Sequence, residues 1–152
     1  MKRKTLIIIC VLGLLFSGCP NPNPDFPRVP FERSYDLYLV SNQDLLTFCG
    51  SVTDTTAGFG GIVLFRRAFD DGYNDFVAYD LACTSASCHY AYSVEIEQFN
   101  ILATCPVCST KYDLLNFGWP TTPNGAMDSE KSHPLQQYNT YFGGRFISVK
   151  NN

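Results

Sequence analysis

The sequence predicts an all-β fold, and two observations support this. Short runs rich in β-branched and aromatic residues recur along the chain between turn-forming residues, and no long segment has the 3.6-residue period of an amphipathic helix. Only residues 42–48 favour a helical turn or two. Such short strands form barrels or stacked antiparallel sheets. We expect strands at 35–40, 61–65, 75–79, 93–97, 100–103 and 145–149, with turns at 70–72, 124–125 and 143–144.

The N-terminus has the pattern of a secretory signal. Three basic residues at 2–4 precede an apolar run of eleven residues at 6–16, which is too short to span a bilayer core of about 30 Å. The run ends on Ser17-Gly18 before Cys19. We therefore predict a signal peptide over residues 1–18.

Residues 15–19, Leu-Phe-Ser-Gly-Cys, resemble the lipobox of bacterial lipoproteins. In that class the cysteine is diacylated and becomes the new N-terminus, which here implies a lipid anchor at Cys19. The protein would then be held on a membrane of the cell envelope, on its periplasmic or cell-surface side. An ordinary signal peptide that is cut nearby, or an uncleaved anchor, are the alternatives.

Removing 18 residues leaves 134, which is room for one domain but not for a large multidomain enzyme. Proline-rich residues 19–28 predict an extended tether that holds a domain over residues 29–152 off the membrane. Without the basic residues at 2–4, eight Lys and Arg stand against 14 Asp and Glu, a net charge of −6. Nucleic acid is therefore not an expected partner.

Four of the seven cysteines form two closely spaced pairs, Cys83-x4-Cys88 and Cys105-x2-Cys108. If the strands between the pairs form a hairpin, both loops lie at one end of the sheet and four sulfurs converge. The spacing suits zinc or an iron-sulfur cluster, whereas two ordinary disulfides, or one disulfide and spare thiols, fit an oxidising compartment equally well. Cys49, among apolar neighbours, is expected to be a buried and inert thiol.

Residues 78–88 and 105–113 resemble the two cluster-binding loops of Rieske iron-sulfur proteins. The respiratory pattern in that family is Cys-Thr-His-Leu-Gly-Cys followed by Cys-Pro-Cys-His-Gly-Ser-x-Tyr-Asp. The stretches 118–120, 134–135 and 144–147 are similar to the proline loop and final strands of the family, so the resemblance covers about residues 60–150. It implies stacked antiparallel sheets with a [2Fe–2S] cluster at one tip.

This chain departs from the Rieske pattern at both histidine ligands. By position, Cys83 and Cys105 match the two cysteine ligands, while Ser85 and Cys108 stand where the histidines should be. Cys88 matches a disulfide cysteine whose partner's place is taken by a valine. A thiolate in place of imidazole would lower the reduction potential and remove histidine-linked proton coupling, so electron transfer to quinone is not implied.

Two classes of function therefore remain open. In one, Cys83, Cys88, Cys105 and Cys108 hold a [2Fe–2S] cluster or zinc, with His89 as a substitute ligand, and a loaded cluster passes single electrons to a redox partner. In the other, the domain is metal-free and serves as a structural or binding module, stabilised by a disulfide from Cys88 to Cys108 or from Cys83 to Cys105. A redox-active Cys105–Cys108 pair of the thioredoxin kind needs a helix that this sequence does not predict. No independent catalytic constellation appears, so an enzyme is the less favoured class.

Overall fold

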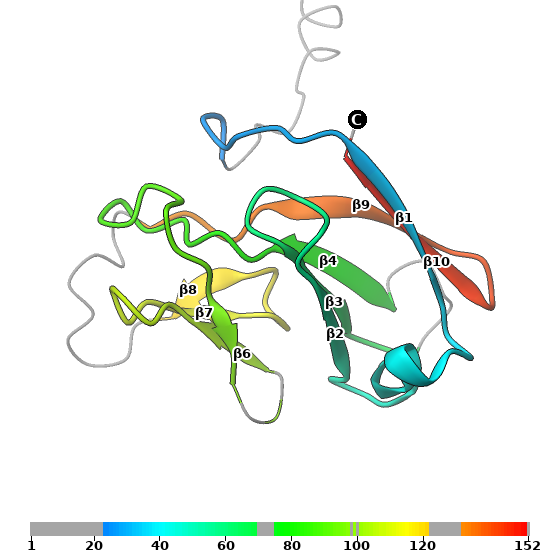
Figure 1. Ribbon diagram of the computed structural model, residues 1–152. Helices are drawn as coiled ribbons and strands as arrows, with labels where there is room; N and C mark the ends of the chain where they lie inside the picture. The colour runs from blue at the N-terminus through cyan, green and yellow to red at the C-terminus, as the bar shows by residue number, and fades with distance from the viewer. Residues whose placement is uncertain (1–22, 70–74, 98, 100, 122–131, 152) are drawn as a thin grey trace, which may run out of the picture.

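The computed structural model describes residues 23–69, 75–97, 99, 101–121 and 132–151. Over these residues the protein is built of antiparallel strands with a single 3-10 helix, η2 (Val40–Leu46), so the predicted all-β class is confirmed (Figure 1). Among them no helix is both long and apolar enough to cross a membrane. The expected turns at 70–72 and 124–125 fall outside the described residues.

The strands form two sheets (Figure 1). The larger sheet has six strands in the order β1-β10-β9-β4-β3-β2, and the smaller has four in the order β5-β6-β7-β8. All paired strands are antiparallel. The strands of the larger sheet, in chain order, are β1 (Phe31–Asp36), β2 (Ser51–Asp54), β3 (Ile62–Arg66), β4 (Phe76–Asp80), β9 (Gln137–Phe142) and β10 (Phe146–Asn151). Those of the smaller sheet are β5 (Glu95–Ile96), β6 (Leu102–Thr104), β7 (Lys111–Asp113) and β8 (Trp119–Thr121).

Strands β3 and β4 lie between two hydrophobic cores, and every residue of both strands is buried. Successive side chains of a strand point to opposite faces. Val63 and Tyr79 therefore join the core shared with the smaller sheet, whereas Ile62 and Ala78 join the core inside the curled larger sheet. Burial on both faces explains why these two strands are nearly continuous apolar runs.

Side chains also tie the two edge strands of the larger sheet together. The Tyr35 hydroxyl on β1 donates a hydrogen bond of 2.9 Å to the carboxylate of Asp54 on β2. Arg33 on β1 lies 3.9 Å from the same carboxylate. These contacts hold the sheet in a curl around Leu45 and Ile147, which are fully buried.

The first strand differs from its expected position. The structure has it at Phe31–Asp36 rather than 35–40, because the Asp36 carboxylate accepts a hydrogen bond from the backbone N–H of Tyr38 and starts a turn. The expected helical turn at 42–48 is present, as η2. The expected turn at 143–144 is also present, where Gly144 has a φ of +79°.

Candidate metal site

The four paired cysteines come from two loops that join different elements. Cys83 and Cys88 lie on the long connection from β4 to β5, and Cys105 and Cys108 lie on the short loop from β6 to β7. The first connection leaves the larger sheet and the second belongs to the smaller one. Any bond between the two loops therefore also joins the two sheets.

Backbone hydrogen bonds fold each loop tightly around its cysteines. In the first loop the N–H of Cys88 donates to the carbonyl of Ser85 at 3.0 Å, and the N–H of Tyr90 donates to the carbonyl of Cys83 at 3.2 Å. In the second, the N–H of Ser109 donates to the carbonyl of Cys105 at 2.9 Å, and Ser109 has a φ of +60°. Left-handed residues of this kind reverse a chain within a few residues. Both cysteine side chains of each loop thus face the same side.

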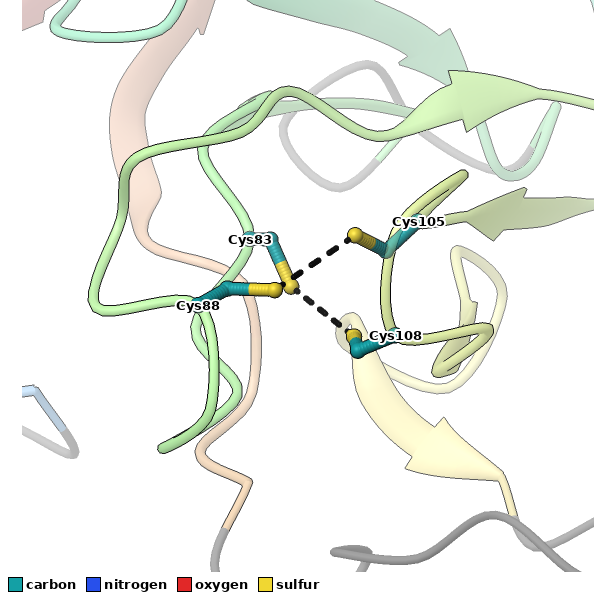
Figure 2. A group of neighbouring side chains, drawn as sticks. All are labelled: Cys83, Cys88, Cys105 and Cys108. Carbon is teal, nitrogen blue, oxygen red and sulfur yellow. Dashed lines mark hydrogen bonds between the residues drawn. The ribbon is translucent and has the colours of Figure 1, made fainter.

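The four Sγ atoms converge on one point between the loops (Figure 2). All lie within 4.8 Å of one another. Cys83 Sγ is 3.6 Å from Cys108 Sγ, and Cys88 Sγ is 3.7 Å from Cys105 Sγ. Cys83, Cys88 and Cys105 are buried, Cys108 is partly exposed, and all four are free thiols. The cluster is therefore nearly closed to solvent and opens at Cys108.

Several hydrogen-bond donors surround the sulfurs. The backbone N–H of Ser85 donates to Cys83 Sγ, and the N–H of Thr110 donates to Cys108 Sγ. The Cys108 thiol donates to Thr110 Oγ1 at 3.2 Å, and the buried Tyr112 hydroxyl lies within hydrogen-bond reach of Cys83 Sγ, at 3.4 Å. Hydrogen bonds donated to sulfur stabilise a charged thiolate. The site is thus equipped to hold sulfur in the anionic form that metals bind.

The four thiols differ in acidity. Burial raises the pKa of Cys83, and it raises that of Cys88 to about 11. Burial also acts on Cys108, but its hydrogen bonds to Thr110 and to the neighbouring thiols outweigh it and lower its pKa to about 6. The most exposed sulfur is therefore the first to ionise and the natural entry point for a metal cation.

These pKa shifts predict that the four thiols contribute most to the stability of the metal-free protein near pH 9. A thiol with a raised pKa stabilises the fold while neutral, so the contribution of Cys88 is lost as the pH rises from 9 to about 11. The lowered pKa of Cys108 acts oppositely, and its contribution is lost as the pH falls from 9 to about 6. Thermal unfolding of the reduced protein in chelator should show this maximum. Replacing Cys108 by serine should remove the acidic limb and weaken the alkaline one, because Cys108 contributes to the raised pKa of Cys88. An unchanged acidic limb would contradict the assignment.

The sequence-predicted residues divide into those the structure brings together and those it does not. In the part of the chain that the structure describes, the group close enough to share a metal ion consists of Cys83, Cys88, Cys105 and Cys108. His89, considered as a substitute ligand, is exposed and is not in that group. Cys49 is a buried free thiol outside the group, as expected. Cys19, the expected lipidation site, lies outside the described residues.

Ser85, at a position that the resemblance gives to a histidine ligand, is buried. Its hydroxyl is hydrogen-bonded to that of Ser87 at 2.9 Å. The donors Thr110 and Tyr112 follow Cys108 closely in the chain, yet the sequence reasoning gave them no role. Thr110 and Tyr112 alternate on the extended approach to β7, and residues two apart share one face of an extended chain, which is the signal that finds them.

Comparisons with models of known families, with curated proteins and with solved structures give no match for this chain. Its function is therefore inferred from the site itself.

Proposed function

We propose that this protein is a metal-binding module that holds one metal ion with four thiolates. The convergence of the four Sγ atoms within 4.8 Å carries the proposal. Bonds of about 2.3 Å from sulfur to a tetrahedral ion give sulfur-to-sulfur separations of about 3.8 Å. The separations of 3.6 and 3.7 Å between the two loops agree with such an ion.

The same distances favour a single ion over a [2Fe–2S] cluster. In that cluster each iron takes two thiolates, and bridging sulfides set thiolates of different irons about 5 Å or more apart. All the sulfurs here are closer than this. The two loops would have to separate to admit the cluster, whereas a single zinc or iron ion needs only small adjustments.

The ion would act first as a cross-link between the sheets. Cys83 and Cys88 follow the larger sheet, and Cys105 and Cys108 belong to the smaller one, so four metal–sulfur bonds would fix one to the other. The β5–β8 sheet is small and its strands are two or three residues long. A structural metal supplies the stability that so small a unit lacks.

Electron transfer is the second candidate, and it applies if the ion is iron. Two observations favour it: the partly exposed Cys108 and the hydroxyl of Tyr112 beside Cys83. An exposed thiolate gives an electron a short path to a partner, and hydrogen bonds to sulfur tune the potential of an iron site. The relationship to Rieske domains remains part of this second proposal, supported by the two cysteine loops in an all-β domain.

Metal analysis of the full chain, purified without oxygen in detergent, tests the proposal. We expect one zinc or iron per chain, and one equivalent of Co²⁺ should give the visible absorption of a tetrahedral thiolate site. Two irons with two acid-labile sulfides per chain would instead establish the cluster. A colourless protein without metal, in which oxidation joins Cys88 to Cys108 or Cys83 to Cys105, would establish the metal-free structural module.

We also propose that Cys19 carries a lipid that anchors the protein in the cell envelope. The support is the Leu-Phe-Ser-Gly-Cys stretch that follows the apolar run. Intact mass measurement tests this: a chain that begins at Cys19 and carries acyl groups is expected. A mature chain that begins elsewhere, or that lacks acyl mass, would contradict it.

A further inference from the structure

Three aromatic rings from three segments pack together in one cluster, here called the aromatic face: the buried Phe26, and Phe59 and Tyr90 at the surface; the exposed Tyr92 follows Tyr90 on the same loop. The ring of Phe26 packs edge-on against Phe59 at 5.9 Å and against Tyr90 at 5.0 Å. Phe59 and Tyr92 are 45% and 48% exposed. The Ser93 hydroxyl donates to the carbonyl of Gly60 at 3.1 Å, which joins the other two segments. In Figure 1 these segments lie on the side where the chain enters.

The start of the described chain is fixed on this side of the domain. The side-chain amide of Asn23 donates a hydrogen bond of 2.7 Å to the carbonyl of Pro134, and Asn23 is 1% exposed. Phe26 is buried as well. Residues 23–28, expected as part of a free tether, therefore pack on the domain ahead of β1.

This packing limits how far the domain can stand from a lipid on Cys19. Four residue steps separate Cys19 from Asn23, and a fully extended chain spans at most about 3.6 Å per residue, or about 14 Å here. A bilayer's headgroup region on one side takes up about 5–8 Å of this reach, which leaves less than about 10 Å. The domain is then held close to the membrane surface, with the side that carries Asn23 nearest to it.

We propose that the aromatic face rests on the lipid bilayer that holds the anchor; this rests on the proposed lipidation of Cys19. Tyrosine and other amphipathic aromatic side chains are favoured at the level of the headgroups. The segment that carries Phe26 exposes both an acidic residue, Asp25, and a basic one, Arg28, so a zwitterionic surface fits it. The occupant is thus a phosphatidylcholine-like or phosphatidylethanolamine-like membrane.

The orientation has a consequence for the metal site. Tyr90 lies two residues beyond Cys88 on the same loop, so the loop that supplies two thiolates also contacts the bilayer. Leu39 and Val40, at the start of η2, are 55% and 82% exposed, and η2 lies at the end of the domain away from the entering chain in Figure 1. These two ends give a matched pair of positions for a test.

The test uses the full lipidated protein in phosphatidylcholine vesicles. One variant has a tryptophan on the aromatic face, and another has a tryptophan at the start of η2. Lipids brominated along the acyl chain quench nearby tryptophan. The emission added by Phe59→Trp should be roughly halved in brominated vesicles, whereas that added by Leu39→Trp should not change. The parent chain, with Trp119 alone, supplies the background to subtract. Tyr90→Trp serves as a second reporter on the aromatic face if Phe59→Trp does not fold.

The experiment distinguishes failure of the proposed lipid anchor from failure of the proposed orientation. A chain without acyl mass that does not float with the vesicles would overturn the anchor, and with it this orientation. An acylated chain that floats but shows equal quenching at both ends would overturn the orientation alone. Metal content is measured on the same samples and reports independently on the four-cysteine site.

Discussion

Replacing Cys108 by serine is expected to abolish stoichiometric metal binding. The change removes one of four thiolates, and loss of even an outer-shell partner costs about 10–100-fold in metal affinity, so loss of a ligand should cost more than about 100-fold. A 1,000-fold loss of affinity removes about 4 kcal/mol of metal-linked stability when the metal is in excess. Equilibrium dialysis with Co²⁺ or Zn²⁺, followed by thermal unfolding with and without metal, measures both effects.

Cys49→Ser is the matched control. Cys49 is buried in the same hydrophobic core as the cluster but is not among the four converging sulfurs. On packing alone, Cys49→Ser should cost more than Cys108→Ser, because Cys49 is the more buried thiol. When metal is present, we expect the opposite: Cys108→Ser should be the more destabilising change, because it removes a metal ligand. Equal metal loss in the two variants, or full occupancy in Cys108→Ser, would refute the assigned ligands.

The strands buried on both faces were predicted most closely, and β5, β6 and β10 also overlap their expected ranges. The continuous apolar stretches around Val63 and Val77 give an unmistakable signal, and β3 and β4 lie within one residue of the expected ranges. β2 and β9 were not predicted, because both have several polar residues and a partly exposed face. Their place is set by pairing with β3 and β4, which local sequence does not encode.

The sequence predicted which four residues form the candidate site, but not the distances between their sulfurs or the groups around them. The paired spacing identifies Cys83, Cys88, Cys105 and Cys108, since two short loops on one hairpin must meet. The distances that favour one ion over a cluster depend on how the smaller sheet packs on β4. The position of Tyr112 beside Cys83 depends on the same packing. Tertiary contacts of this kind leave no periodic signal in the chain.

The second large effect is expected at Asp80, the last residue of β4. Its side chain is completely buried and accepts four hydrogen bonds. Three come from the backbone N–H groups of Phe59, Gly60 and Ala82, at 2.7, 3.0 and 2.7 Å, and the fourth comes from the Tyr138 hydroxyl at 2.7 Å. Burial and this hydrogen bond raise the pKa of Tyr138, so its hydroxyl keeps its proton.

The glycine loop around Asp80 leaves no room for another arrangement. Gly58 has a φ of +75°, and a Cβ there would lie 2.6 Å from Asp80 Oδ2. A Cβ at Gly60 would lie 2.7 Å from the backbone nitrogen of Ala82. The loop therefore closes directly on the carboxylate and cannot bring a substitute acceptor to the donors.

Asp80→Ala should thus leave two buried donors, the Ala82 N–H and the Tyr138 hydroxyl, and two partly buried ones without their acceptor. At about 1–3 kcal/mol for each buried donor, we expect the free energy of unfolding to fall by about 4 kcal/mol. That is a large share of the 5–15 kcal/mol typical of a domain. Asp80→Asn should cost about 1–3 kcal/mol, because its amide keeps one acceptor oxygen and Tyr138 can turn to accept from the amide, while one backbone N–H loses its partner. Denaturant unfolding of the metal-loaded protein measures both variants.

The same substitutions should also weaken metal binding, since Ala82 precedes Cys83 and its N–H is held by the Asp80 carboxylate. Asp44→Asn on the surface of η2 is the control, with no expected change in either quantity. If Asp80→Ala unfolded at the same denaturant concentration as the parent chain, the carboxylate could not be what closes the loop. If Asp80→Asn lost stability but kept full metal affinity, the first cysteine loop would be positioned by its own backbone hydrogen bonds and by the metal rather than by the end of β4.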